Sequence, residues 1–112
     1  MIYSKVVTFE PSGYITAANA NHFQAQLSAV INAPDYSVLL VDMERVDFLD
    51  SSGLMVLVSA FRQTQQLGKR LIVCSISPSV RMIFELTQLD RIFEIFENRE
   101  TFHTSFGECL AA

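Results

Sequence analysis

The sequence predicts a single small α/β domain with a mixed, mostly parallel sheet of four to five strands and about four helices. Two segments, Ser37–Asp42 and Arg70–Cys74, carry uninterrupted runs of apolar, largely β-branched and leucine residues, which are typical of strands buried on both faces. Segments with apolar residues at helical spacing alternate with these strands. The chain of 112 residues has the length of one domain, so we expect right-handed crossovers within a single sheet.

The N-terminal part is expected to form a β-hairpin followed by a helix. Lys5–Phe9 is predicted as a short strand, Glu10-Pro11-Ser12-Gly13 as a turn, and Tyr14–Thr16 as the start of a second strand. The close spacing of the two strands predicts an antiparallel pair. Asn19–Asn32 has apolar residues at helical spacing and is expected to be an amphipathic helix capped by Asn19.

The second half of the chain predicts three further helices. One follows the polar segment after Ser37–Asp42 and is expected to run to about Gln66, with Gly68 as its stop. Ser77-Pro78 opens the next as cap and first residue. Arg91–Phe96 is expected to be the final strand, and Asn98–Leu110 the last helix. The apolar face of that last helix consists of Phe102, Phe106, Cys109 and Leu110.

Composition and charge exclude several classes of function. Half of the residues are hydrophobic and 18% are charged, as in globular proteins. The net charge is -4 and the eight lysine and arginine residues are scattered, which argues against direct binding of nucleic acid. No apolar run reaches the roughly 18 residues of a membrane span, and the N-terminus lacks the hydrophobic region of a secretory signal. We therefore expect a cytoplasmic protein without a membrane segment.

Catalytic and metal-binding motifs are missing from the sequence. There is no GxxxxGK[ST], GxGxxG or HExxH motif. Cys74 and Cys109 lack CxxC spacing and are interpreted as ordinary intracellular thiols. His22 and His103 are expected to be half-exposed helix residues. These observations predict a protein that is not an enzyme and that uses no cofactor.

Two alternatives rest on the aspartates and one serine. Asp42, Asp47 and Asp50 follow a strand and are of the type that binds Mg²⁺. A phospho-aspartate receiver would need an acidic pair after its first strand, where this chain has Glu10-Pro11-Ser12-Gly13. A small hydrolase or nucleotide-binding protein could use Ser52, but a GxSxG elbow and an evident base are missing. Both alternatives are therefore weakly supported.

The segment Asp47-Phe48-Leu49-Asp50-Ser51-Ser52-Gly53-Leu54 gathers carboxylates, hydroxyls and a glycine at the start of a helix. Either Asp50 or Ser51 can cap this helix. Ser52 lies in the first turn, where unpaired N–H groups and the helix dipole favour negative charge, so a phosphate there would find donors. Asp47 and Asp50 would repel it. The segment predicts either a plain helix cap or a reversible phosphorylation site.

The same segment resembles the signature of the STAS domain (sulphate transporter and anti-sigma factor antagonist). It is most similar to the stand-alone bacterial anti-sigma factor antagonists. Four other segments also fit: the start at Gly13–Thr16, the two strands that end at Asp42 and Cys74, and the helix start Ser77–Arg81. The resemblance therefore covers nearly the whole chain, and we expect residues 1–112 to form one STAS domain.

The resemblance implies a partner-switching mechanism. The unphosphorylated antagonist binds an anti-sigma factor that is also a serine kinase and so frees a sigma factor. Phosphorylation ends this binding, and a metal-dependent serine phosphatase restores it. Carried over, the phosphorylated residue is Ser52, and the partner-binding residues are Asp47, Asp50, Ser51, Gly53, Leu54 and Met55. The alternative is a non-switching STAS interaction subunit of a transport or stress-signalling complex.

Two residues of this set carry specific expectations. Gly53 is expected to leave space for a kinase active site at a cost of about 1 kcal/mol in helix propensity. Met55, together with Val56, is expected to form part of the contact face. A dianion placed in such a face would weaken binding, because an uncompensated charge is costly to bury.

Overall fold

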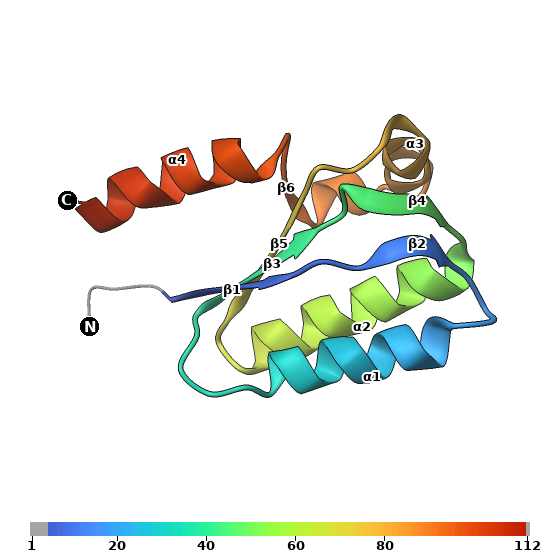
Figure 1. Cartoon of the computed structure of the whole chain (residues 1–112), viewed down its shortest axis with the longest axis horizontal. Coiled ribbons are helices and arrows are strands. Elements are labelled where there is room, and N and C mark those ends of the chain that lie inside the picture. Colours follow the sequence, from blue (N-terminus) through green and yellow to red (C-terminus); the bar gives the residue numbers. More distant parts are fainter. Residues whose placement is uncertain (1–4, 112) are drawn as a thin grey trace.

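A four-stranded parallel sheet forms the centre of the fold (Figure 1). This computed structural model describes residues 5–111, with side chains for residues 5–105. The elements, in chain order, are β1 (Val6–Phe9), β2 (Ser12–Ile15), α1 (Ala20–Ile31), β3 (Val38–Asp42), β4 (Arg45–Leu49), α2 (Ser51–Gln66), β5 (Arg70–Cys74), α3 (Pro78–Leu86), the short 3₁₀ helix η1 (Leu89–Arg91), β6 (Glu94–Phe96) and α4 (Arg99–Ala111). The main sheet has the order β1-β3-β5-β6, and β2 and β4 form a second, two-stranded sheet.

The α/β class and the four helices confirm the prediction, but the N-terminal hairpin was wrong. β1 pairs with β3 and β2 pairs with β4, and both pairs are parallel. Only Glu10 and Pro11 separate β1 from β2. A two-residue hairpin loop needs residues that accept positive φ, whereas proline fixes φ near about -65° and keeps the preceding residue extended. The chain therefore continues from one sheet into the other without reversing, as Figure 1 shows.

The strand β4 was not predicted from the sequence. Met43 and Glu44 carry the chain from β3 into the small sheet, where Val46 and Leu49 of β4 are buried. These two residues are three positions apart because the pairing with β2 shifts and leaves Asp47 without a counterpart. The predicted site therefore follows β4 and not the main-sheet strand β3.

The central strands β3 and β5 of the main sheet are buried on both faces, as their continuous apolar runs predicted. Side chains alternate between the two faces along each strand. One face packs with α1 and α2 through Leu39, Val41, Leu71 and Val73. The other face packs with Phe102 of α4 through Val38, Leu40, Ile72 and Cys74. The side chains of Phe106, Cys109 and Leu110, which were expected to extend that contact, lie outside the described residues.

The helix ends follow the predicted signals closely. α2 ends before Gly68, whose φ of 72° suits glycine. α3 begins at Pro78 and is capped by the Ser77 hydroxyl. The final strand is shorter than the predicted Arg91–Phe96, because η1 includes Arg91. Within residues 5–111, no helix is both long and apolar enough to cross a membrane.

An ion pair fixes the start of α4 to the carboxyl end of the main sheet. Arg99 Nη2 lies 2.7 Å from Asp42 Oδ2 and 2.9 Å from Glu10 Oε2. Hydrogen bonding with Glu10 raises the pKa of Arg99, so the guanidinium stays charged. The buried Asp42 carboxylate is thus compensated within the fold.

Candidate phosphorylation site

The start of α2 is held by the carboxylate of Asp50. Its Oδ1 accepts hydrogen bonds from the N–H of Ser52 (2.9 Å) and of Gly53 (3.1 Å). Its Oδ2 accepts one from the N–H of Ala17, at 3.1 Å, in the loop before α1. Asp50, and not Ser51, is therefore the cap of this helix, and it also joins two loops that are far apart in the sequence.

These contacts correct one expectation about the site. The unpaired N–H groups of the first turn were expected to be available to a phosphate, but those of Ser52 and Gly53 are already bonded to Asp50. A phosphate on Ser52 would also lie close to the negative charge of that carboxylate. Two of the first-turn N–H groups of α2 are therefore not free for a phosphate in this conformation.

Gly53 is required by packing, a reason that the sequence did not indicate. A Cβ atom at this position would lie 2.6 Å from Leu49 Cδ1 and 2.9 Å from the Ile15 carbonyl oxygen. Both distances are too short for carbon in a packed core. Leu54 is also buried, with 6% of its surface exposed. Gly53 and Leu54 hold the turn against β2 and β4, and their side-chain positions offer almost no surface to a partner.

The outward side of the same turn is accessible. Met55 is 57% exposed, and Asp47 and Ser51 are also exposed. Ser52 is half-buried, and its hydroxyl makes no hydrogen bond within the described residues. Val56 is buried, contrary to its expected place in a contact face. Ser52 borders a groove of about 300 Å³ between α1 and α2, which is lined by Ala17, Ala20, Asn21, Gln24, Ser52, Met55, Val56 and Ser59.

Comparison with known proteins agrees with this geometry and identifies the family. The STAS domain family model matches residues 2–102. The chain belongs to the STAS domain family. It is 32% identical over 98 residues to BtrV of Bordetella bronchiseptica, described as a candidate anti-sigma factor antagonist, covering 88% of this chain and 84% of that protein.

Solved structures of other STAS proteins share the fold of this chain. An anti-sigma factor antagonist from Mycobacterium paratuberculosis is 25% identical with a TM-score of 0.81, covering 94% of this chain and 88% of the other. The Bacillus cell fate determinant SpoIIAA in its phosphorylated form is 21% identical with a TM-score of 0.67, covering 94% and 95%. At 21% identity, the similarity to SpoIIAA shows that the two proteins share a fold and nothing further.

Sequence reasoning missed several residues near the site of this STAS domain. Tyr14 is 65% exposed and Phe48 is 41% exposed, and their ring centroids are 6.3 Å apart on neighbouring strands. Asn21 and Gln24 reach the groove from α1. Recognition of β4 would have placed Phe48 on the outer face of the small sheet, but no sequence signal indicated the approach of α1.

The aspartates of this STAS domain do not form a metal site. Among the residues that the structure describes, no group of three or more His, Cys, Asp or Glu side chains could hold a metal ion. Asp42 pairs with Arg99, Asp50 caps α2, and Asp47 is exposed on the bulge of β4. Cys74 is buried, and burial raises the pKa of its thiol, so it stays protonated and unreactive near neutral pH.

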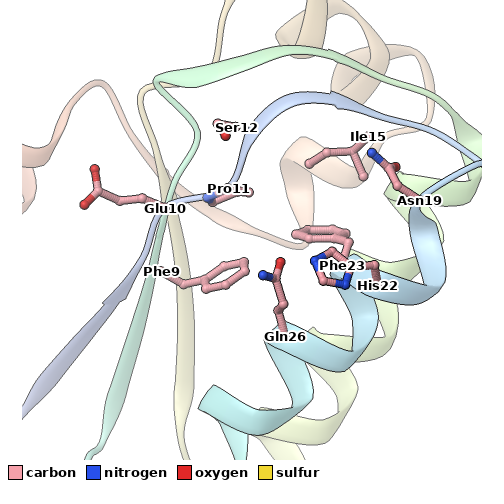
Figure 2. Close-up of a pocket in the computed structure, with 9 residues that line it drawn as sticks. All are labelled: Phe9, Glu10, Pro11, Ser12, Ile15, Asn19, His22, Phe23 and Gln26. Carbon is pink, nitrogen blue, oxygen red and sulfur yellow. The ribbon is translucent and has the colours of Figure 1, made fainter.

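A second cavity of about 290 Å³ lies between α1 and the β1–β2 segment (Figure 2). Figure 2 shows the Glu10 carboxylate turned away from this cavity, and Glu10 pairs with Arg99 instead. The Asn19 amide is also engaged, because it donates to the Tyr14 carbonyl (2.7 Å) and accepts from the Thr16 N–H (2.9 Å). Glu10 and Asn19, two of the polar residues that line this cavity, are therefore engaged within the fold.

Proposed function

We propose that this STAS domain is an anti-sigma factor antagonist that works as a phosphorylatable binding module. Its unphosphorylated form binds an anti-sigma factor that is also a serine kinase. Phosphorylation of Ser52 releases that partner, and a metal-dependent serine phosphatase resets the module. The observation that carries the proposal is Ser52 itself: the residue is half-buried in the first turn of α2, close after β4 and beside the exposed Met55, and its hydroxyl has no hydrogen bond among the described residues.

The comparisons support this proposal at a coarser level. The relative that shares 32% of its residues over 88% of this chain is described as a candidate anti-sigma factor antagonist. SpoIIAA, which shares the fold, has a phosphorylated form. The phosphorylation of Ser52 itself, the kinase and the phosphatase are our proposals for this chain.

The contact surface follows from the exposure of the predicted residues. Asp47, Ser51 and Met55 are exposed and can touch a partner directly. Asp50, Gly53 and Leu54 act through the shape of the turn, because their side-chain positions are bonded or packed internally. We therefore propose that the partner covers the outward side of the first turn of α2, including Ser52.

The charge of a phosphate explains the direction of the switch. A phosphoserine carries nearly two negative charges, and an interface that covers it must desolvate them without a matching cation. Asp50 adds repulsion because its hydrogen bonds hold its carboxylate at the helix start. A penalty of about 4 kcal/mol would weaken binding on the order of 10³-fold.

Incubation with the cognate kinase and ATP, followed by mass spectrometry, tests the proposed residue. We expect one phosphate on Ser52 in the wild type and none in Ser52→Ala, whereas Ser51→Ala, the neighbouring control, is still modified. Modification of another residue with Ser52 untouched would contradict the assignment. In pull-downs, Ser52→Ala should stay bound in the presence of ATP and Ser52→Asp should bind poorly. Equal binding of both variants would favour the non-switching STAS subunit.

A further inference from the structure

We propose that the amide side chains of Asn21 and Gln24 receive a phosphate on Ser52 in the groove between α1 and α2. The inference rests on the proposed function, since it starts from phosphorylated Ser52. It assigns to α1 a role in the phosphorylated state that neither the motif nor the family resemblance contains. The phosphate is then held across two helices and not by the helix that carries it.

Asp50 occupies two of the N–H donors in the first turn of α2. Asp50 Oδ1 already accepts from the N–H groups of Ser52 and Gly53. Moving this carboxylate aside would also break its bond to the Ala17 N–H, which connects α2 to the loop before α1. A phosphate on Ser52 therefore turns away from Asp50, toward the side where neutral donors are available.

The groove beside Ser52 is lined by neutral side-chain donors from α1. Ser52 shares it with Asn21 and Gln24, which lie three positions apart and therefore on the same face of α1. Each side-chain amide offers two N–H donors. Both side chains are exposed and make no hydrogen bond within residues 5–105, so they can turn toward a phosphate without breaking a contact. The volume of about 300 Å³ leaves space for the group.

The helix dipole of α1 also attracts a phosphate in this groove, in addition to the side-chain donors. Asn19 precedes α1 but does not cap it with its side chain, because its amide is bonded to Tyr14 and Thr16. The first turn of α1 contains no acidic residue that would offset the positive end of the helix dipole. Ala20 and Asn21 of this turn line the groove. A dianion in the groove is thus attracted from the α1 side and repelled from the Asp50 side.

Phosphorus NMR of protein with phosphoserine placed at position 52 by genetic code expansion tests this inference. The measured quantity is the second pKa of the phosphate, which is about 6 in an exposed phosphoserine. Donors that favour the dianion lower this pKa. We expect the double variant Asn21→Ala/Gln24→Ala to raise it by about half a unit, which is roughly a threefold change in proton affinity.

Gln26→Ala is the matched control, because Gln26 is an exposed glutamine of the same helix that lines the other cavity (Figure 2). It should leave the phosphate pKa unchanged. An unchanged pKa in the double variant, or an equal shift in the control, would overturn the inference. All three positions are exposed on α1, so the variants should stay folded, which circular dichroism verifies. Since the phosphate is installed directly, failure of a kinase to modify Ser52 would contradict the proposed function and leave this test intact.

Discussion

The inward and outward sides of the first turn of α2 differ in what they contribute. The inward side consists of Asp50, Gly53 and Leu54, and the outward side of Ser51, Ser52 and Met55. The inward residues are bonded or packed against β2, β4 and the loop before α1. On the outward side, the side chains of Ser51 and Met55 are exposed, and Ser52 is half-buried. Half of this sequence motif is therefore needed to build the turn, and only the other half is free to meet a partner.

This division predicts which substitutions affect stability and which affect binding. Changes on the inward side should lower the free energy of unfolding and impair binding indirectly, through the loss of folded protein or of the shape of the turn. Changes on the outward side should leave the free energy of unfolding unchanged and alter affinity. The four substitutions that follow test this division in order of decreasing expected effect.

Gly53→Val should give the largest effect. The added carbons would collide with the Leu49 side chain and the Ile15 carbonyl, where even a Cβ atom is too close. We expect a loss of about 3 kcal/mol in the free energy of unfolding, measured by urea denaturation. Gly53→Ala is the more decisive test, because replacing glycine by alanine inside a helix normally stabilises a protein by about 1 kcal/mol. Since packing requires the glycine, we expect that this variant is not stabilised. A more stable Gly53→Ala variant would contradict the packing argument.

Asp50→Ala should be the next most damaging substitution. It removes the acceptor of three N–H groups, those of Ala17, Ser52 and Gly53. Loss of a helix cap and of hydrogen bonds to a charged group should cost roughly 2 kcal/mol in the free energy of unfolding. In amide hydrogen exchange, protection should fall at Ala17 as well as at Ser52. A loss confined to α2 would show that the connection to the loop before α1 is unimportant.

Met55→Ala should change binding without changing stability. Met55 is 57% exposed, so its truncation should alter the free energy of unfolding by less than about 0.5 kcal/mol. If the partner covers it, affinity for the anti-sigma factor should fall about tenfold in isothermal titration calorimetry. Met82→Ala is the matched control, because Met82 is 60% exposed but belongs to α3. Equal losses in both variants would show that affinity does not depend on this turn.

Ser51→Ala should have the smallest effect. The Ser51 side chain is exposed, and Asp50 rather than Ser51 caps the helix. We expect a change of less than about 0.5 kcal/mol in the free energy of unfolding. Kinase treatment should still modify Ser52 at a similar rate. A loss of modification in Ser51→Ala would show that the Ser51 hydroxyl is needed, and it would contradict the assignment of the phosphate to Ser52.

The sequence predicted those parts of the fold that depend on local signals. The continuous apolar runs located β3 and β5, and the caps and stops at Ser77 and Gly68 located helix ends. The small sheet was missed because the bulge at Asp47 spaces the buried residues of β4 by three and removes the alternation that marks a strand. The expected hairpin failed because the same turn-like residues also suit a chain that continues straight ahead.

The candidate site shows the same limit. The motif and its resemblance indicated Ser52 and a cap at Asp50 or Ser51. Two facts were out of reach, since both involve residues more than thirty positions away: the bond from Asp50 to Ala17, and the approach of Ile15 to Gly53. Such long-range contacts determine which backbone N–H groups at the start of α2 are free. They also explain why position 53 needs a glycine.

Calorimetric titration of the anti-sigma factor with two forms of this domain measures directly whether a phosphate on Ser52 controls binding. One form is unmodified, and the other carries a phosphate on Ser52 alone. We expect the unmodified form to bind and the phosphorylated form to bind on the order of 10³-fold more weakly, with the same fold by circular dichroism. Equal affinity of the two folded forms would contradict the account.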